Sequence, residues 1–219
     1  LVTANVYLPR NASFPAPAVV VVPGHAMEEG KNYGLYMRAQ IGLARMGCIV
    51  LGYDPIGQGE RKLPGFDHTM GYGSLLVGET NEGMIVWDTI RAVDYLLTRP
   101  DVDPARLGLT GNSGGGENTF YTMPLEERLA AAASFCFVCS YEDWIRDGGN
   151  HCICNHLPGI LNHMEEFEIL ALNTPRPFLS GSGAEDKIFP IDGVRRTCER
   201  ARRIYRMYGA ADRMVNIDV

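Results

Sequence analysis

The stretch Arg106-Leu-Gly-Leu-Thr-Gly-Asn-Ser-Gly-Gly-Gly116 decides the fold of this chain. Its short apolar part, Leu107–Thr110, predicts a strand, and a helix is expected after the glycines, so that Ser113 lies in a sharp turn between them. Gly111 and Gly115 leave room for such a turn because they carry no Cβ atom. A serine hydroxyl held in this way, next to a base, acts as a nucleophile. The alternative is a glycine-rich loop that contains a serine by chance, and the predicted strand and helix on either side favour the nucleophile.

Strands and helices are expected to alternate along the rest of the chain. The continuous β-branched run Ala18–Val22 suits a strand that is covered on both faces, as in a parallel sheet. This alternation predicts an α/β fold, a mostly parallel, doubly wound sheet flanked by helices and connected by right-handed crossovers. We expect a single domain over residues 1–219. The predicted strands cover residues 2–8, 18–22, 48–53, 107–110, 131–138, 178–181 and 214–219. The predicted helices cover residues 33–46, 81–97 and 193–208. A glycine-rich loop is expected over residues 56–78.

Composition and charge exclude several classes of partner. With 219 residues, 46% of them hydrophobic, the chain can bury one sizeable core. Its formal charge of −6 disfavours a nucleic-acid surface, and the arginines between residues 195 and 206 alternate with apolar residues at helical spacing, which indicates the solvated face of an amphipathic helix. No apolar run reaches the length of a membrane span. Six cysteines in a chain of this length predict no dense disulfide framework, and the sequence assigns no compartment.

Four segments fit one template in order and spacing. They are residues 23–27 (PGHAM), 53–61 (YDPIGQGER), 111–115 (GNSGG) and 181–186 (GSGAED), the last leading to Phe189-Pro190. With these segments the chain resembles the serine esterases of the α/β-hydrolase superfamily, and within them it is most similar to the acetyl xylan esterase and dienelactone-hydrolase-like groups. The resemblance implies the α/β-hydrolase fold. Because the chain starts at what resembles the second or third strand, it is expected to be truncated at both ends.

The resemblance also implies roles for particular residues. Ser113 is the nucleophile and the Gly114 N–H the first oxyanion donor, which also follows from its place at a helix start. The second donor is expected from the loop after the first long strand, at the Ala26 or Met27 backbone N–H. His25 organises that loop and borders the substrate pocket, or it is a buried imidazole bonded to backbone.

An acidic residue is expected after the strand at residues 178–181. Asp186 occupies the position from which the acid of this family orients the catalytic histidine. Its neighbour Glu185 is the residue that could be confused with it, and the alternative is two surface carboxylates in a turn. A structural polar network near the site is expected from Asp54, Gln58, Glu60 and Arg61, because the turn between them needs side-chain hydrogen bonds.

The general base is the residue that the sequence does not supply. In the family that this chain resembles, a histidine follows the last strand, and no histidine follows His163 in the sequence given. We therefore expect the base beyond Val219, in a longer esterase. His151 as a substitute base is the lesser alternative.

The segment His151-Cys-Ile-Cys-Asn-His156 contains four residues of metal-ligating type. Its spacing does not match common zinc motifs, and no second ligand pair follows it, so no metal site is predicted, and a metal-binding protein that uses residues 151–156 is the lesser alternative. The resemblance instead implies that residues 140–172 form an insertion that covers the pocket, with Trp144 and His151 in the pocket wall.

Together these features predict a serine carboxylic-ester hydrolase that forms an acyl-serine and needs no cofactor. An acetylated or otherwise esterified carbohydrate is the substrate class implied by the resemblance. The alternatives are a peptidase or lactone hydrolase on the same scaffold, or a non-catalytic binding module on a decayed hydrolase fold. Exposed sheet edges predict self-association, with no nucleic-acid or membrane partner.

Overall fold

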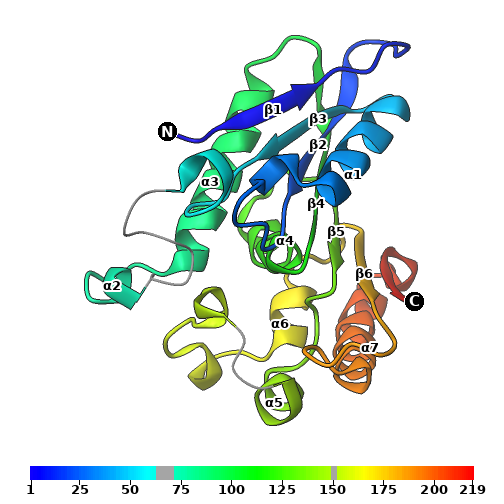
Figure 1. The fold of residues 1–219 in the computed structure, drawn as a ribbon. Helices are drawn as coiled ribbons and strands as arrows, with labels where there is room; N and C mark the ends of the chain where they lie inside the picture. The colour runs from blue at the N-terminus through cyan, green and yellow to red at the C-terminus, as the bar shows by residue number, and fades with distance from the viewer. Residues whose placement is uncertain (63–71, 149–151) are drawn as a thin grey trace.

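The computed structural model describes residues 1–62, 72–148 and 152–219, and over these residues the chain forms one twisted sheet flanked by helices (Figure 1). The strand order is β1-β3-β2-β4-β5-β6-β7. β1 pairs antiparallel with β3, and every other pair is parallel. The strands are β1 (Ala4–Tyr7), β2 (Ala16–Val22), β3 (Ile49–Tyr53), β4 (Val102–Asn112), β5 (Ala131–Phe135), β6 (Phe178–Ser182) and β7 (Met214–Asp218).

The expected α/β fold with a mostly parallel, doubly wound sheet is confirmed. The helices are α1 (Gly34–Arg45), α2 (Tyr72–Leu75), α3 (Asn81–Leu97), α4 (Gly114–Leu125), α5 (Tyr141–Asp143), α6 (Glu166–Ala171) and α7 (Ile191–Met207). The bounds of α1, α3 and α7 agree closely with those of the three predicted helices. A short helical turn, α2, lies within the predicted loop 56–78, of which residues 63–71 lie outside the described part of the chain. Among the described residues, none of the helices has the length and apolarity needed to cross a membrane.

The β-branched run in β2 is covered on both faces, as its composition predicts. Val20 and Val22 pack into the large core that contains Phe120 of α4. Val21 points the other way and packs with Ala44 of α1 and Val50 of β3. Successive side chains of a strand point to opposite faces, so the unbroken apolar run requires helices on both sides.

The strand predicted over residues 131–138 ends earlier, at Phe135. Cys136 has a positive φ of 53°, which breaks the extended conformation, and its N–H donates to the Gly181 carbonyl at 2.8 Å. The chain therefore bends at the carboxyl end of β5 and leads into α5 and α6, which lie beyond that end of the sheet (Figure 1).

Candidate active site

Ser113 lies in a strained turn between β4 and α4, as the sequence predicts. Its φ of 55° and ψ of −122° form a conformation that residues other than glycine rarely adopt. The Ser113 N–H donates to the Phe135 carbonyl at 2.8 Å, and its own carbonyl accepts from the Glu117 N–H at 2.8 Å. The residue is half-buried. The turn is thus fixed on both sides, while the serine side chain stays accessible.

The glycines around Ser113 are required by close backbone contacts. A Cβ atom on Gly115 would lie 2.7 Å from the Val22 carbonyl carbon, and one on Gly111 would lie 2.7 Å from the Val22 oxygen. Both positions face β2, where no side chain could be accommodated. The predicted role of Gly111 and Gly115 is therefore confirmed by the packing.

Asp186 follows β6 at the same edge of the sheet. The register pairs Asn112 of β4 with Phe135 of β5, and Phe135 with Gly181 of β6. The turns that follow these strands therefore begin at the same edge of the sheet. The Asp186 carboxylate is half-buried and accepts hydrogen bonds from the backbone N–H groups of residues 188 and 189, at 2.8 and 3.1 Å. Glu185 is exposed. Asp186, and not Glu185, is the carboxylate fixed at the edge that carries Ser113.

The loop after β2 lies directly against the serine. A Cβ atom on Gly24 would lie 3.1 Å from the Ser113 Cβ and 2.6 Å from the Tyr36 hydroxyl oxygen. Burial raises the pKa of Tyr36, and a hydrogen bond from the Gly24 N–H opposes that effect in part. The sequence placed Tyr36 on a helix but gave no signal that its hydroxyl would reach the serine turn, because the contact depends on how α1 packs against the sheet.

Of the two predicted donors in this loop, the Ala26 N–H is engaged within the protein. It donates to Gln58 Oε1 at 2.8 Å. The Met27 N–H has no hydrogen-bond partner among the described residues, and the Met27 carbonyl accepts from Gly59 at 3.0 Å. The loop therefore retains the Met27 N–H as its candidate oxyanion donor, and the Ala26 N–H serves to hold the loop in place.

The predicted polar network forms around Asp54, which is fully buried. Its carboxylate accepts from the Lys31 N–H at 2.8 Å, from Lys31 Nζ at 2.6 Å and from the Thr3 hydroxyl at 2.7 Å. Arg61 donates to the Asp54 carbonyl at 3.0 Å, and Glu60 pairs with Lys31. Together with the bond from Ala26 to Gln58, these contacts attach the loop after β2 to the loop after β3.

His25 contacts two thiols. Its Nε2 atom lies 3.2 Å from Cys152 Sγ and 3.7 Å from Cys154 Sγ. Burial lowers the pKa of His25, but the hydrogen bond and charge of Cys152 and the charge of Glu117 outweigh it, so the pKa of His25 is raised overall. The ring also lies beside Gly114, where an added Cβ would be 3.0 Å from His25 Cε1. The imidazole of His25 is thus positioned by two thiols. Neither of the predicted roles of His25, organiser of the loop or imidazole bonded to backbone, included a contact with cysteine.

The segment expected to cover the pocket forms an apolar cavity of about 320 Å³. Trp144 is buried and lines it together with Tyr141, Leu157 and Ile160, and Tyr72 and Leu75 of α2 line it as well. His156 also lines this cavity, and its Nδ1 atom lies 3.0 Å from the Cys152 carbonyl oxygen. His151 lies outside the described residues. Ser113 does not line the cavity, so the role of Trp144 as a wall of the substrate pocket stays a prediction.

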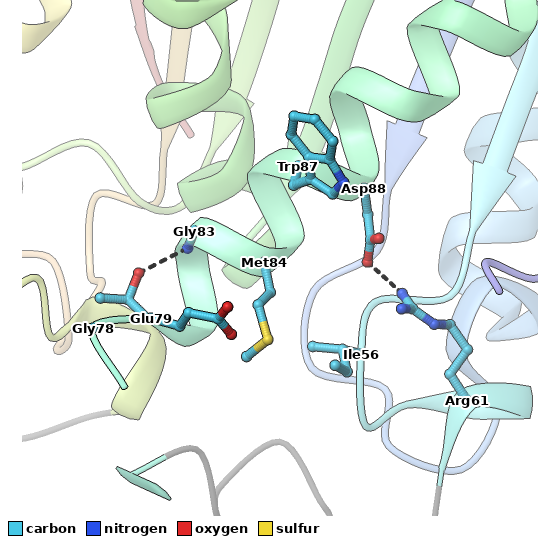
Figure 2. Close-up of a pocket in the computed structure, with 9 residues that line it drawn as sticks. Ile56, Arg61, Gly78, Glu79, Gly83, Met84, Trp87 and Asp88 are labelled. Carbon is cyan, nitrogen blue, oxygen red and sulfur yellow. Dashed lines mark hydrogen bonds and ion pairs between the residues drawn. The ribbon is translucent and has the colours of Figure 1, made fainter. Parts of the chain in front are cut away.

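A second pocket, of about 580 Å³, lies on α3 and the loop after β3 (Figure 2). Figure 2 shows Arg61 and Asp88 paired at one side of it and Met84 and Ile56 beside them. Residues of the serine turn do not line this pocket. A different set on α3, Glu82 and Ile85, borders a void of about 10 Å³ next to Gly114. The larger pocket is therefore not the place where Ser113 would act.

A half-buried serine at a strained turn between strand and helix, on a sheet of this order, defines an α/β hydrolase. Residues 1–150 match the model of the acetyl xylan esterase (AXE1) family. The chain belongs to the acetyl xylan esterase family.

Individual relatives agree with this assignment. YtaP of Bacillus subtilis (strain 168), described as a hydrolase, is 29% identical over 215 residues, which are 93% of this chain and 72% of YtaP. Methylesterase BT1017 is 26% identical with a TM-score of 0.79, over 100% of this chain and 46% of that protein. A Bacteroides fragilis NCTC 9343 protein described as an acetyl xylan esterase shares the fold, with a TM-score of 0.83 at 18% identity, over 99% of this chain and 62% of the other. The chain thus spans about half to two thirds of these solved structures.

Proposed function

We propose that this protein is a serine ester hydrolase in which Ser113 attacks the ester carbonyl. The observation that carries the proposal is the serine turn, with a positive φ at Ser113 and an accessible side chain at the edge where β4, β5 and β6 end. Family membership supports the same reaction class. Strain at a non-glycine residue is concentrated at functional sites, and a purely structural turn at this position would favour glycine.

The proposed reaction has two steps. The Ser113 oxygen adds to the carbonyl carbon while a histidine takes the serine proton, and the tetrahedral oxyanion is stabilised by the Gly114 and Met27 N–H groups. The C–O bond to the alcohol breaks, and the alcohol leaves with the proton from the histidine. Water then hydrolyses the acyl-serine with the same base. In this proposal Asp186 orients the histidine, which the family resemblance places after the last strand of the sheet.

The proposed substrate is an acetylated carbohydrate, in which the sugar supplies the alcohol. The name of the matching family supports this choice. The name of methylesterase BT1017 points to the other arrangement, in which methanol would leave and the acid would stay on the serine. We further propose that residues 140–172 cover the pocket and bind the substrate on the side of Trp144.

The experiment measures ester hydrolysis by the full natural chain. The substrates are 4-nitrophenyl acetate, acetylated xylan and a methyl-esterified uronic acid, with a peptide amide and a lactone measured for comparison. Ser113→Ala is expected to lower kcat/KM by about a thousandfold or more, because removal of the nucleophile leaves only binding and the oxyanion donors. Ser13→Ala, at an exposed serine, is the matched control and should leave the rate unchanged.

The possible outcomes distinguish the proposed esterase from its alternatives. Equal rates for Ser113→Ala and the wild type would reject Ser113 as nucleophile. Faster turnover of an amide or a lactone than of any ester would favour the other hydrolase classes. Absence of turnover on every substrate would favour a binding module.

Self-association through the edge strands β1 and β7 also stays a proposal. Within the described chain each of these strands pairs on one side only, and unpaired backbone groups favour a further strand. A monomer at high protein concentration in light scattering would contradict it.

A further inference from the structure

Three side chains of metal-ligating type meet beside the serine turn. His25 comes from the loop after β2, and Cys152 and Cys154 come from the segment between α5 and α6. One ligand atom of each, the imidazole nitrogen and the two sulfurs, all lie within 4.8 Å of one another. The fold thus brings the imidazole to two thiols that lie 127 and 129 positions further along the chain.

Hydrogen bonding alone accounts poorly for this geometry. An imidazole Nε2 atom carries either one proton or one lone pair, so it can form one good hydrogen bond. Both sulfurs nevertheless lie against the same nitrogen, at 3.2 and 3.7 Å. In a tetrahedral zinc site with bonds of about 2.3 Å to sulfur and about 2.0 Å to nitrogen, the nitrogen and sulfur atoms lie about 3.5 Å apart. The two observed nitrogen–sulfur distances lie on either side of that value.

The carboxyl group of Glu117 on α4 lies next to this cluster and contacts one of its ligands. Glu117 is almost completely buried, and its carboxyl group lies within hydrogen-bond reach of the Cys154 thiol. Its Oε1 atom has no hydrogen-bond partner among the described residues. Among the described residues, Glu117 forms no ion pair with a lysine or arginine. The neighbouring Glu82, which is also buried, forms no such ion pair in that part of the chain either. A buried carboxylate oxygen without a partner is costly, and a bound cation would remove that cost.

We propose that His25, Cys152 and Cys154 bind a zinc ion, with Glu117 hydrogen-bonded to the ligand Cys154. Two thiolates and an imidazole are ligands that Zn²⁺ takes in tetrahedral sites, and three protein ligands leave the fourth position open. The ion joins the loop after β2 to the segment at residues 152–155. Because the His25 ring lies against Gly114, the ion also fixes the backbone next to Ser113. The proposal does not depend on the proposed esterase activity.

The first test is the metal content of the full natural chain, purified without chelators and measured by elemental analysis. We expect about one zinc ion per chain after exposure to zinc and dialysis. Cys152→Ser/Cys154→Ser should hold less than about a tenth of that amount. Cys48→Ser changes a thiol outside the cluster and should retain the full amount, which makes it the matched control. Glu117→Gln should weaken zinc binding about tenfold to a hundredfold in competition with a chelator.

A second test avoids variants that could fail to fold. The wild-type protein is loaded with Co²⁺ in place of zinc, and its absorption spectrum is recorded. We expect the strong visible bands of tetrahedral cobalt and a thiolate-to-cobalt charge-transfer band in the near ultraviolet. No metal in the reduced, zinc-exposed protein together with no thiolate band would overturn the proposal and leave a cluster of hydrogen-bonded thiols. A Cys152–Cys154 disulfide in the freshly purified protein, seen by intact mass, would overturn it as well.

Discussion

At Ser113 the backbone holds a conformation that costs about 1–3 kcal/mol for a residue with a side chain. The surrounding contacts offset this cost. The Ser113 amide is bonded to β5, its carbonyl to α4, and Gly115 packs against the β2 backbone without a gap. The sequence could predict this turn, because glycines at fixed positions between a strand and a helix are typical of a sharp turn that presents a serine. It could not predict that Ala26 would be engaged by Gln58, since that contact joins two loops.

Gly115→Ala tests the packing at the turn. The added methyl group would overlap the Val22 carbonyl, which is backbone and cannot move aside, so we expect a loss of about 3 kcal/mol or more in the free energy of unfolding. Gly42→Ala is the control, because no atom lies within 4 Å of its Cβ position on α1. This change should stabilise the protein by about 0.5–1 kcal/mol. Urea unfolding of the three proteins measures both effects, and a neutral Gly115→Ala would contradict the packing described here.

At the scale of elements, the long helices and buried strands follow from periodicity and composition, whereas the segment between β5 and β6 does not. The six-residue helix α6 is too short for an amphipathic pattern to be recognised. It forms because Glu165 and Glu168 cap its first turn and because Ile169 and Leu170 enter the core. The packing of Ile169 and Leu170 into the core is a tertiary contact, which a single sequence does not show.

The carboxyl group of Glu166, at the start of α6, predicts a pH dependence of stability. The pKa of Glu166 is raised from 4.5 to about 8, chiefly by burial and also by the charges of Glu165 and Glu117, while the hydrogen bond from the Cys139 N–H opposes the rise in part. The folded protein therefore retains a proton that the unfolded chain releases. Between these two pKa values the free energy of unfolding falls as the pH rises, by up to about 1.4 kcal/mol per pH unit from this group.

Glu166→Gln should remove that contribution, since the amide oxygen still accepts from Cys139 and no longer titrates. We expect the variant to lose less stability than the wild type between about pH 5 and pH 8 in urea titrations. Glu127→Gln, at an exposed carboxylate, should follow the wild type. Identical slopes for Glu166→Gln and the wild type would show that Glu166 does not retain its proton on folding.

For the whole molecule, the order of strands brings together groups that are far apart in the chain. The carboxyl ends of β2, β4 and β6 supply the loop with Met27, the serine turn and Asp186. The order of the four sequence segments could predict this arrangement, because parallel strands end at one edge of a sheet. The meeting of His25 with Cys152 and Cys154 could not be predicted, because the cysteine segment lies in an irregular connection whose path is set by packing. The sequence showed residues of metal-ligating type at 151–156 but predicted no metal site there, and the structure brings the imidazole of His25 to two of them.

The most direct test of the account is covalent labelling of the full natural chain with a fluorophosphonate, followed by peptide mass spectrometry. A serine activated by a base and oxyanion donors reacts at phosphorus, whereas an ordinary serine does not. We expect one label per chain, located on Ser113, with none in Ser113→Ala and a full label in Ser13→Ala. A label on another residue, or no label on a folded chain, would contradict it.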